Sequence, residues 1–149
     1  MPRQKREPKK PSKASKDIEE RIQKNYFTNF EINQEFELTD THKSFIELAL
    51  NKKTKISMID GPAGSAKTYL SVLAALQCLK NNYVDEIVYV RSIVESSSRS
   101  LGSLPGEADE KFLPWMYPLF DKLQELLSET SAKNLISEDI VRGIPVNFV

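Results

Sequence analysis

The chain has few of the features that hold secreted or membrane proteins together. It has a single cysteine, Cys78, so no disulfide can form within it. No apolar run approaches the ~18 residues that cross a bilayer. The start, Met-Pro-Arg-Gln-Lys-Arg, has no apolar segment of a secretory signal behind it. We therefore expect a cytoplasmic protein with no membrane partner.

The chain has no net charge, because 21 basic residues balance 21 acidic ones, but the basic residues are unevenly distributed along it. Residues 1–16 carry seven Lys or Arg against one Glu, a net charge of +6, and almost no apolar side chains. Such a segment cannot offset its own ordering entropy, so we expect a disordered basic arm over 1–16 and one domain over 17–149. The arm either contacts RNA or single-stranded DNA or is a passive terminus; both alternatives stay open.

Glycine is scarce as well, yet two of the five glycines fall in the stretch 61–68, Gly-Pro-Ala-Gly-Ser-Ala-Lys-Thr. This matches the phosphate-binding pattern GxxxxGK(S/T), with Ala66 in place of the second glycine. The backbone N–H groups of such a turn bind phosphate oxygens, Lys67 would contact the β- and γ-phosphates, and Thr68 would ligate Mg²⁺. Alanine does not adopt positive φ cheaply, so we expect the phosphate site to survive only if Ala66 has an ordinary negative φ close to helical values. The alternative is a plain Gly-rich turn with Lys67 as a solvated cap residue.

The elements around this turn have the order of an α/β protein. The apolar pattern predicts a strand over 55–59, a buried helix over 69–79, and a strand over 86–90 that is buried on both faces. Another helix should begin at Thr39 or Asp40 and close at 51–54. Strand, helix and strand form one right-handed βαβ unit.

Arg91 and Ser92 follow the second strand at the carboxyl edge, where open α/β sheets bind ligands. Arg91 therefore either contacts a γ-phosphate or is an ordinary strand-end arginine that faces solvent or pairs with a carboxylate.

The second half of the chain reads as a loop, a helical region and a final strand. Residues 93–107 are too polar and rich in Gly and Pro for a regular element. The apolar stripe from Phe112 to Leu126 predicts a core-facing helix, broken or kinked near Pro114 and Pro118. A short helix over 136–141 and a strand over 145–149 should follow.

These motifs together resemble the PhoH-like family, the phosphate-starvation-type ATPases of bacteria and bacteriophages. The resemblance extends over about residues 36–149, and its most specific parts are the phosphate turn and the loop Leu-Gly-Ser-Leu-Pro-Gly at 101–106. Further matching segments are Tyr69-Leu70, Val90-Arg91, Glu110-Lys111 and Pro118-Leu-Phe-Asp121. The resemblance implies a RecA-like P-loop NTPase core with a parallel sheet, ATP and Mg²⁺ as ligands, and kinship with superfamily 1 helicases. A bacteriophage member, acting in the host cytoplasm, is the expected source.

Two departures from the family pattern bear on function. His42 stands where we align the glutamine that reads adenine in the helicase-like families, which puts adenine selectivity in doubt. The family's Asp-Glu-Ala-Gln segment, which carries the Walker B carboxylates, is absent. Asp85-Glu86 cannot replace it, because this pair precedes its strand. We therefore expect a domain that is incomplete at its C-terminus.

Three functions compete at this point. The first is an ATPase module coupled to RNA or DNA, with the possibility of a homo-oligomer. The second is a protein that binds nucleotide or nucleic acid without hydrolysis, which the missing carboxylates favour. The third, a small-molecule kinase, needs an arginine-rich lid, and the loop 93–107 contains only Arg99. Whether the chain is an enzyme stays undecided. The catalytic candidates are Lys67, Thr68 and Arg91, with Thr68 as metal ligand; the nucleotide contacts are Gly61, Pro62, Ala63, Gly64, Ser65, Ala66, Lys67, Thr68 and Tyr69.

Overall fold

The computed structural model describes residues 29–92 and 108–146, with the backbone alone for 108–113 and 145. The basic arm and the loop predicted at 93–107 lie outside the described residues. In chain order, the elements are α2 (Asp40–Leu50), α3 (Lys67–Lys80), β1 (Ile87–Arg91), α4 (Ala108–Leu126), α5 (Glu129–Ser137) and β2 (Val141–Pro145).

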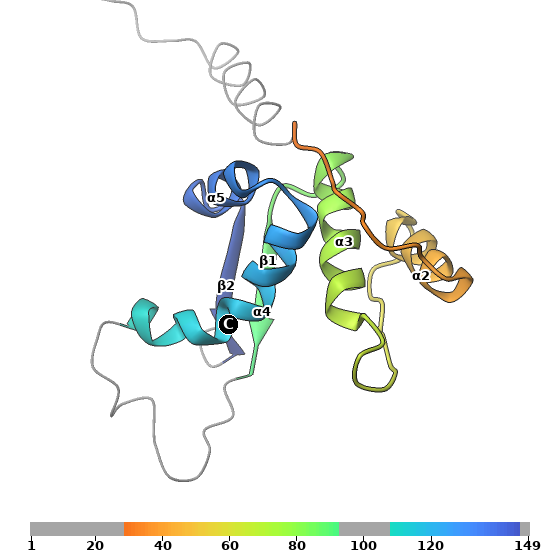
Figure 1. Ribbon diagram of the computed structural model, residues 1–149, viewed down its shortest axis with the longest axis horizontal. Helices are drawn as coiled ribbons and strands as arrows, with labels where there is room; N and C mark the ends of the chain where they lie inside the picture. Colours follow the sequence, from red (N-terminus) through yellow and green to blue (C-terminus); the bar gives the residue numbers. More distant parts are fainter. Residues whose placement is uncertain (1–28, 93–107, 147–149) are drawn as a thin grey trace, which may run out of the picture.

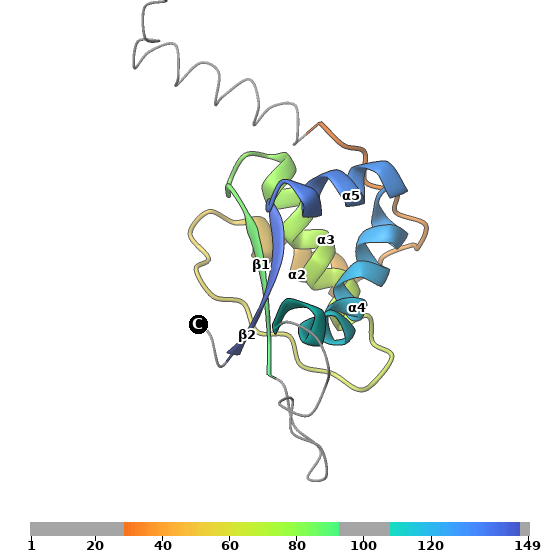
Figure 2. The same ribbon diagram turned by 90° about the vertical axis from the view of Figure 1, so that its left-hand side faces the viewer.

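α3 lies at the centre of the helical part, where it contacts both α2 and α4 (Figures 1 and 2). Its apolar sequence predicts burial on several sides, and the structure confirms this prediction. The largest side chains with less than 2 % exposure come mainly from three helices: Leu73, Leu76, Leu79, Leu119, Leu123, Leu126, Leu135 and Val141. Burying a leucine contributes roughly 1.5–3 kcal/mol, so these contacts fix the position of α3 and of the turn before it.

β1 and β2 are parallel neighbours, paired from Ile87 opposite Val141 to Arg91 opposite Pro145. The Ile87 N–H donates to the carbonyl oxygen of Ile140 at 2.8 Å. The connection between these strands contains α4 and α5, so the strand–helix–strand unit that the structure forms is β1–α4–α5–β2. It is a different unit from the one predicted around α3.

The predicted strand over 55–59 is wrong, since residues 54–60 have neither helix nor strand conformation in the structure. Ile56 is 84 % exposed and Met58 is 93 % exposed. A strand needs a neighbour to bond its backbone, and no described segment pairs with this one. The prediction that β1 is buried on both faces is also wrong, because Val88 and Val90 are 38 % and 48 % exposed.

Pro114 and Pro118 lie inside α4, where each proline removes one helical hydrogen bond. Figure 1 shows α4 bending between its teal first part and its blue later part, in agreement with the predicted kink. Two further boundaries differ from the prediction. Instead of a helix over 136–141, α5 ends at Ser137 and Val141 already begins β2. The last strand therefore starts four residues before Pro145, which is its final residue. Residues 147–149 are outside the described part. No helix within the described ranges is long and apolar enough to cross a membrane.

Candidate functional site

The turn between residue 60 and α3 is fixed by hydrogen bonds to its own side chains. The Gly61 N–H donates to Asp60 Oδ1 at 2.8 Å. At the other end, the Ser65 N–H and hydroxyl both donate to the carbonyl oxygen of Pro62, at 3.3 and 2.9 Å. A side chain on Gly61 would collide with this arrangement, because its Cβ would lie 2.8 Å from Ser65 Oγ. The sequence of the turn therefore specifies one compact loop.

Two residues of this loop have left-handed backbone conformations. Gly64 has φ +82°, and Ala66 has φ 57° and ψ 19°. The prediction of a negative φ at Ala66 is wrong. The backbone must reverse into α3 at this position whichever residue occupies it, and alanine accepts the strain of ~1–2 kcal/mol that glycine avoids. The loop path thus follows the glycine pattern even where the glycine is missing.

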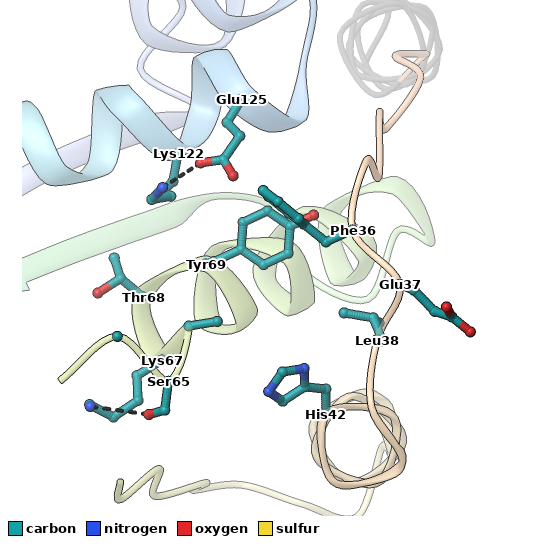
Figure 3. Close-up of a pocket in the computed structure, with 12 residues that line it drawn as sticks. Phe36, Glu37, Leu38, His42, Ser65, Lys67, Thr68, Tyr69, Lys122 and Glu125 are labelled. Carbon is teal, nitrogen blue, oxygen red and sulfur yellow. Dashed lines mark hydrogen bonds and ion pairs between the residues drawn. The ribbon is translucent and has the colours of Figure 1, made fainter. Parts of the chain in front are cut away.

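The Lys67 ammonium lies over the loop that precedes it (Figure 3). Its Nζ donates to the carbonyl oxygens of Gly61 and Pro62 at 2.7 and 2.6 Å, and to Ser65 Oγ at 3.4 Å. Lysine has three N–H donors, so all of them are directed at the loop. The ammonium is therefore bonded to the loop, and the choice between a phosphate site and a plain Gly-rich turn stays open.

The start of α3 differs from those of α2 and α5. Thr39 caps α2 by accepting from the His42 N–H at 3.3 Å, and Ser128 caps α5 by accepting from the Ser131 N–H at 3.2 Å. At α3 the capping position is Ala66, which has no side-chain acceptor. The first helical bond comes from Leu70 to Ala66, so the N–H groups of residues 67–69 have no helical partner. These donors and the helix dipole make the α3 start an anion-binding position.

A pocket of about 610 Å³ opens beside this helix start. Gly64, Ser65, Ala66, Lys67, Thr68 and Tyr69 line one side of it. The opposite sides are formed by Phe36, Leu38 and His42, and by Lys122 and Glu125 of α4. Figure 3 shows His42 reaching from α2 toward the loop, with Tyr69 and Phe36 side by side above it. The volume falls in the usual range of ligand pockets.

Tyr69 lines this pocket beside Phe36 (Figure 3). Its ring meets Phe36 edge-on, with centroids 5.6 Å apart and planes at 80°. The hydroxyl is buried and has no hydrogen-bond partner among the described residues. Burial raises the pKa of Tyr69, and the charges of Glu125 and Glu35 raise it further, so the hydroxyl stays protonated as a donor. Glu125 pairs with Lys122 on α4.

Of the other predicted site residues, Thr68 lines the pocket and Arg91 does not. Thr68 borders the pocket and also a second one beside β1. Arg91 ends β1, where its Nη1 donates to the Trp115 carbonyl oxygen at 3.4 Å and its guanidinium lies 5.9 Å from the Trp115 ring centroid. Arg91 is thus held against α4 and does not line the pocket. Its role toward a phosphate stays a prediction.

Sequence reasoning missed the wall opposite the loop. Phe36 and Leu38 precede α2, whereas Lys122 and Glu125 lie more than fifty residues after the loop. No local motif connects them, and only the packing of α2 and α4 on α3 brings them together. His42 was found because it stands at a known position of the resembling families.

Metal ligands are sparse around the site. Within 29–92 and 108–146, no three His, Cys, Asp or Glu side chains are grouped so that they could hold a metal ion. The assignment of the Thr68 hydroxyl to Mg²⁺ therefore rests on the sequence pattern and stays a prediction.

Comparison with known proteins places the chain in a family. The family described as PhoH-like protein matches residues 37–149, which include the loop, both strands and every residue of the pocket lining except Phe36. The chain belongs to the PhoH-like family. It is 35 % identical to the PhoH-like protein of Bacillus subtilis (strain 168) over 102 residues, which are 68 % of this chain and 32 % of that protein.

Other PhoH-like relatives are similar at the same level. The PhoH-like protein of Mycobacterium tuberculosis (strain ATCC 25618 / H37Rv) is 33 % identical over 108 residues, which are 67 % of this chain and 30 % of that protein. Protein PhoH2 of Bacillus subtilis (strain 168) is 37 % identical over 100 residues, 66 % of this chain and 22 % of that protein. The matched region thus spans about a third of the length of these relatives or less. No solved structure matches the chain.

Proposed function

We propose that the loop 61–68 binds the phosphates of ATP, with Mg²⁺, as part of a RecA-like P-loop core. The observation that carries this proposal is the uncapped start of α3. Two helices of the same chain use a side-chain cap, whereas α3 begins with free N–H donors beside the Lys67 ammonium. An anionic ligand satisfies these donors and complements the positive end of the helix dipole.

Lys67 supports the same proposal through its present partners. Among the described residues, its ammonium is bonded only to neutral oxygen atoms of the loop. Charge-assisted bonds to phosphate are stronger, so Nζ would exchange these carbonyls for the β- and γ-phosphate oxygens. Thr68 would ligate the Mg²⁺, which neutralises phosphate charge when it is bound. The pocket of about 610 Å³ beside the helix start has room for the nucleoside.

The test is calorimetric titration of the chain with Mg·ATP. Lys67→Ala removes a charge-assisted contact of about 1.5–3 kcal/mol, so affinity should fall about ten- to a hundredfold. Lys80→Ala is the matched control, because Lys80 is exposed at the opposite end of the same helix. Equal affinity of Lys67→Ala and Lys80→Ala would remove the loop as the phosphate site.

We propose further that this 149-residue chain turns ATP over negligibly. Hydrolysis needs the metal and the attacking water positioned by additional groups. In the sequence no carboxylate pair follows a predicted strand, and the described residues contain no acidic metal cluster. Steady-state ATPase activity clearly above that of Lys67→Ala would contradict this proposal and would favour the complete ATPase function.

The second candidate is a non-hydrolysing protein that binds nucleotide or nucleic acid in the cytoplasm. The +6 charge of residues 1–16 favours RNA or single-stranded DNA as its partner. Deleting the arm should weaken single-strand binding and flatten the plot of log affinity against log salt by about 0.7 per lost phosphate contact. An unchanged slope would leave the arm a passive terminus. Measuring ATP turnover with and without RNA separates this candidate from an RNA-coupled ATPase.

A further inference from the structure

Three lysines and a tyrosine form a surface patch at the end of α3 that is remote from the phosphate loop, and we call it the lysine–tyrosine patch. Lys52, Lys53 and Lys55 lie in the connection that follows α2, and Tyr83 lies in the connection that follows α3. The two connections meet, because the Lys52 Nζ lies 4.5 Å from the centroid of the Tyr83 ring. The 14 residues of α3 separate the patch from the loop, a length of roughly 20 Å for a helix.

The backbone at the end of α3 fixes the position of the tyrosine. Asn82 has a left-handed φ of 54°, and its N–H donates to the carbonyl oxygen of Leu79 at 3.0 Å. The Tyr83 N–H donates to the carbonyl oxygen of Cys78 at 2.9 Å. These two bonds are those of a Schellman ending, in which the side chain at the Tyr83 position commonly packs on the helix. Tyr83 is nevertheless 45 % exposed, so the helix ending explains where the ring lies but leaves much of it at the surface.

The lysines project from a turn that is also fixed by hydrogen bonds. The Lys53 N–H donates to Asn51 Oδ1 at 3.0 Å, and the Thr54 N–H donates to the Asn51 carbonyl oxygen at 2.8 Å. Lys52, Lys53 and Lys55 are all exposed. None of the ion pairs between described residues uses any of the three. Their ammonium groups are therefore available to an anion from outside the chain.

The surroundings of the patch favour a negatively charged partner. Glu86 begins the turn into β1 near Tyr83, but its carboxylate pairs with Arg142 at 3.1 and 3.3 Å, so its charge is compensated. Figures 1 and 2 show the orange start of the described chain, residue 29, at the same end of the molecule as the connection between α3 and β1. Residues 1–16, which precede it in the chain, carry a net charge of +6. Uncompensated positive charge at one end of a molecule attracts polyanions.

We propose that the lysine–tyrosine patch binds a single-stranded nucleic acid, with the lysine ammonium groups on its phosphates and one base stacked on Tyr83. Lysines alone bind any polyanion, but an exposed aromatic ring among them matches the unpaired bases that lie beside the phosphates of a single strand. A duplex keeps its base faces inside the stack. The 4.5 Å contact keeps the Lys52 ammonium beside the ring, as adjacent phosphate and base contacts require. An anionic membrane would need a wider apolar face than Tyr83 and Val84 supply.

This inference goes beyond the proposed function, because neither the phosphate loop nor residues 1–16 form part of the patch. Nucleotide and strand would occupy opposite ends of α3, with the buried core of the helix between them. The two proposals can therefore fail separately. Calorimetry of Lys67→Ala with Mg·ATP tests the loop without any nucleic acid, and the experiments below test the patch without any nucleotide.

Fluorescence anisotropy of the full chain with three labelled probes tests the stacking. The probes are oligo-dT, oligo-U and an abasic strand, each of about 12 nucleotides. Tyr83→Ala should weaken binding of oligo-dT and oligo-U at least about fivefold, the lower limit for the loss of one stacked base, and leave the abasic strand unaffected. The higher-affinity oligomer of the two identifies RNA or DNA as the source. Tyr83→Phe keeps the ring and should keep the affinity. Tyr117→Ala is the control, because Tyr117 is 58 % exposed on α4, outside the patch.

Charge variants test the phosphate contacts. Lys53→Gln and Lys55→Gln should each weaken binding of all three probes, including the abasic strand. Each should also flatten the plot of log affinity against log salt by about 0.7, the value for one phosphate contact of a single strand. Lys43→Gln removes the same charge from the first turn of α2, at the other end of that helix, and should change neither quantity.

Three results would overturn the proposal. If Tyr83→Ala weakens the abasic strand as much as oligo-dT, the ring supports the fold of the patch and stacks on no base. If every patch variant binds like the unchanged chain, residues 1–16 alone hold the strand. If the patch variants lose binding to phosphatidylserine vesicles but not to the oligonucleotides, the partner is a lipid surface.

Discussion

The N-terminal ends of α5 and α3 differ in their caps and in the charges of their first turns. At α5, Ser128 caps the helix, Glu129 places a negative charge in the first turn, and the backbone before the helix is ordinary extended chain. At α3, Ala66 offers no cap, the first turn has no acidic residue, and Lys67 adds a positive charge to a positive helix end. Every local choice at α5 favours the folded helix, and every choice at α3 disfavours it unless an anion is present.

Under the proposed phosphate binding, this difference indicates where stability has been given up for binding. The helical core surrounds α3 with fully buried leucines, so the helix persists without help at its first turn. The strain at Ala66 and the like charges at the helix start are tolerated for the same reason. Variants of the two helix starts can test whether the α5 start contributes only stability and the α3 loop contributes binding at the expense of stability.

The largest effect is expected for Gly64→Ala in the loop. The added Cβ would meet nothing within 4 Å, so the cost comes from φ +82° alone. A left-handed alanine costs about 1–2 kcal/mol, which should appear as a lower free energy of unfolding in urea. A decrease in the free energy of unfolding below about 0.3 kcal/mol, a fraction of that cost, would show that the loop relaxes to another path. Backbone strain would then no longer distinguish the α3 start from the α5 start.

Ser128→Ala removes the cap that distinguishes α5. The Ser131 N–H loses its acceptor at 3.2 Å, which should cost about 1 kcal/mol of unfolding free energy. Ser137→Ala at the last residue of α5 is the control, since its hydroxyl donates to a carbonyl that the helix end can leave to water. Mg·ATP affinity should be unchanged in both variants. A loss of affinity in Ser128→Ala alone would contradict a purely structural role for the α5 start.

Ala66→Gly should stabilise the folded protein, because Ala66 has a strained, left-handed backbone conformation. Glycine adopts φ 57° without the Cβ penalty, although it loses more entropy on folding. The net gain should be about 0.5–1 kcal/mol in the free energy of unfolding. Thermal and urea unfolding would measure it, and Ala63→Gly, a loop change without a left-handed φ, is the control. A gain of equal size in the control would mean that the φ at residue 66 carries no strain.

The sequence is a better guide to α2 and α3 than to the sheet. The local pattern limits the cap of α2 to Thr39 or Asp40, and Thr39 is the cap in the structure. The helix expected at 136–141 is instead α5 at Glu129–Ser137, so helix prediction also fails in the second half of the chain. A strand is completed by a neighbour that the local pattern does not name. The segment 55–59 has the composition of a buried strand but no partner among the described residues, and β2 begins earlier than predicted because its pairing with β1 sets its limits.

The candidate site also has residues that the sequence predicts and residues that it does not. The loop residues and Lys67 could be predicted because a contiguous motif specifies them. The left-handed φ of Ala66 could not, since the residue type argued against the conformation that the loop path imposes. Phe36 and Lys122 were missed because they reach the pocket only through helix packing. The residues of a contiguous motif can be predicted from the sequence, whereas the residues on the opposite wall of the pocket depend on how the helices pack.

The smallest effect concerns the charge at the α5 start. Lys133 donates a hydrogen bond to Glu129, and this bond and its charge lower the pKa of that carboxyl. A carboxyl with a lowered folded pKa contributes stability above its unfolded pKa of ~4.3 and loses it as the pH falls through the folded pKa. Glu129→Gln should therefore reduce the unfolding free energy slightly near neutral pH and not at all in acid. Both side chains are more than two thirds exposed, so salt should weaken the effect further.

Urea unfolding of both proteins across this pH range is the measurement, with Glu47→Gln on α2, away from a helix start, as control. A difference that grows toward acid would mean that the negative charge destabilises α5, and the contrast with α3 would then rest on the Ser128 cap alone.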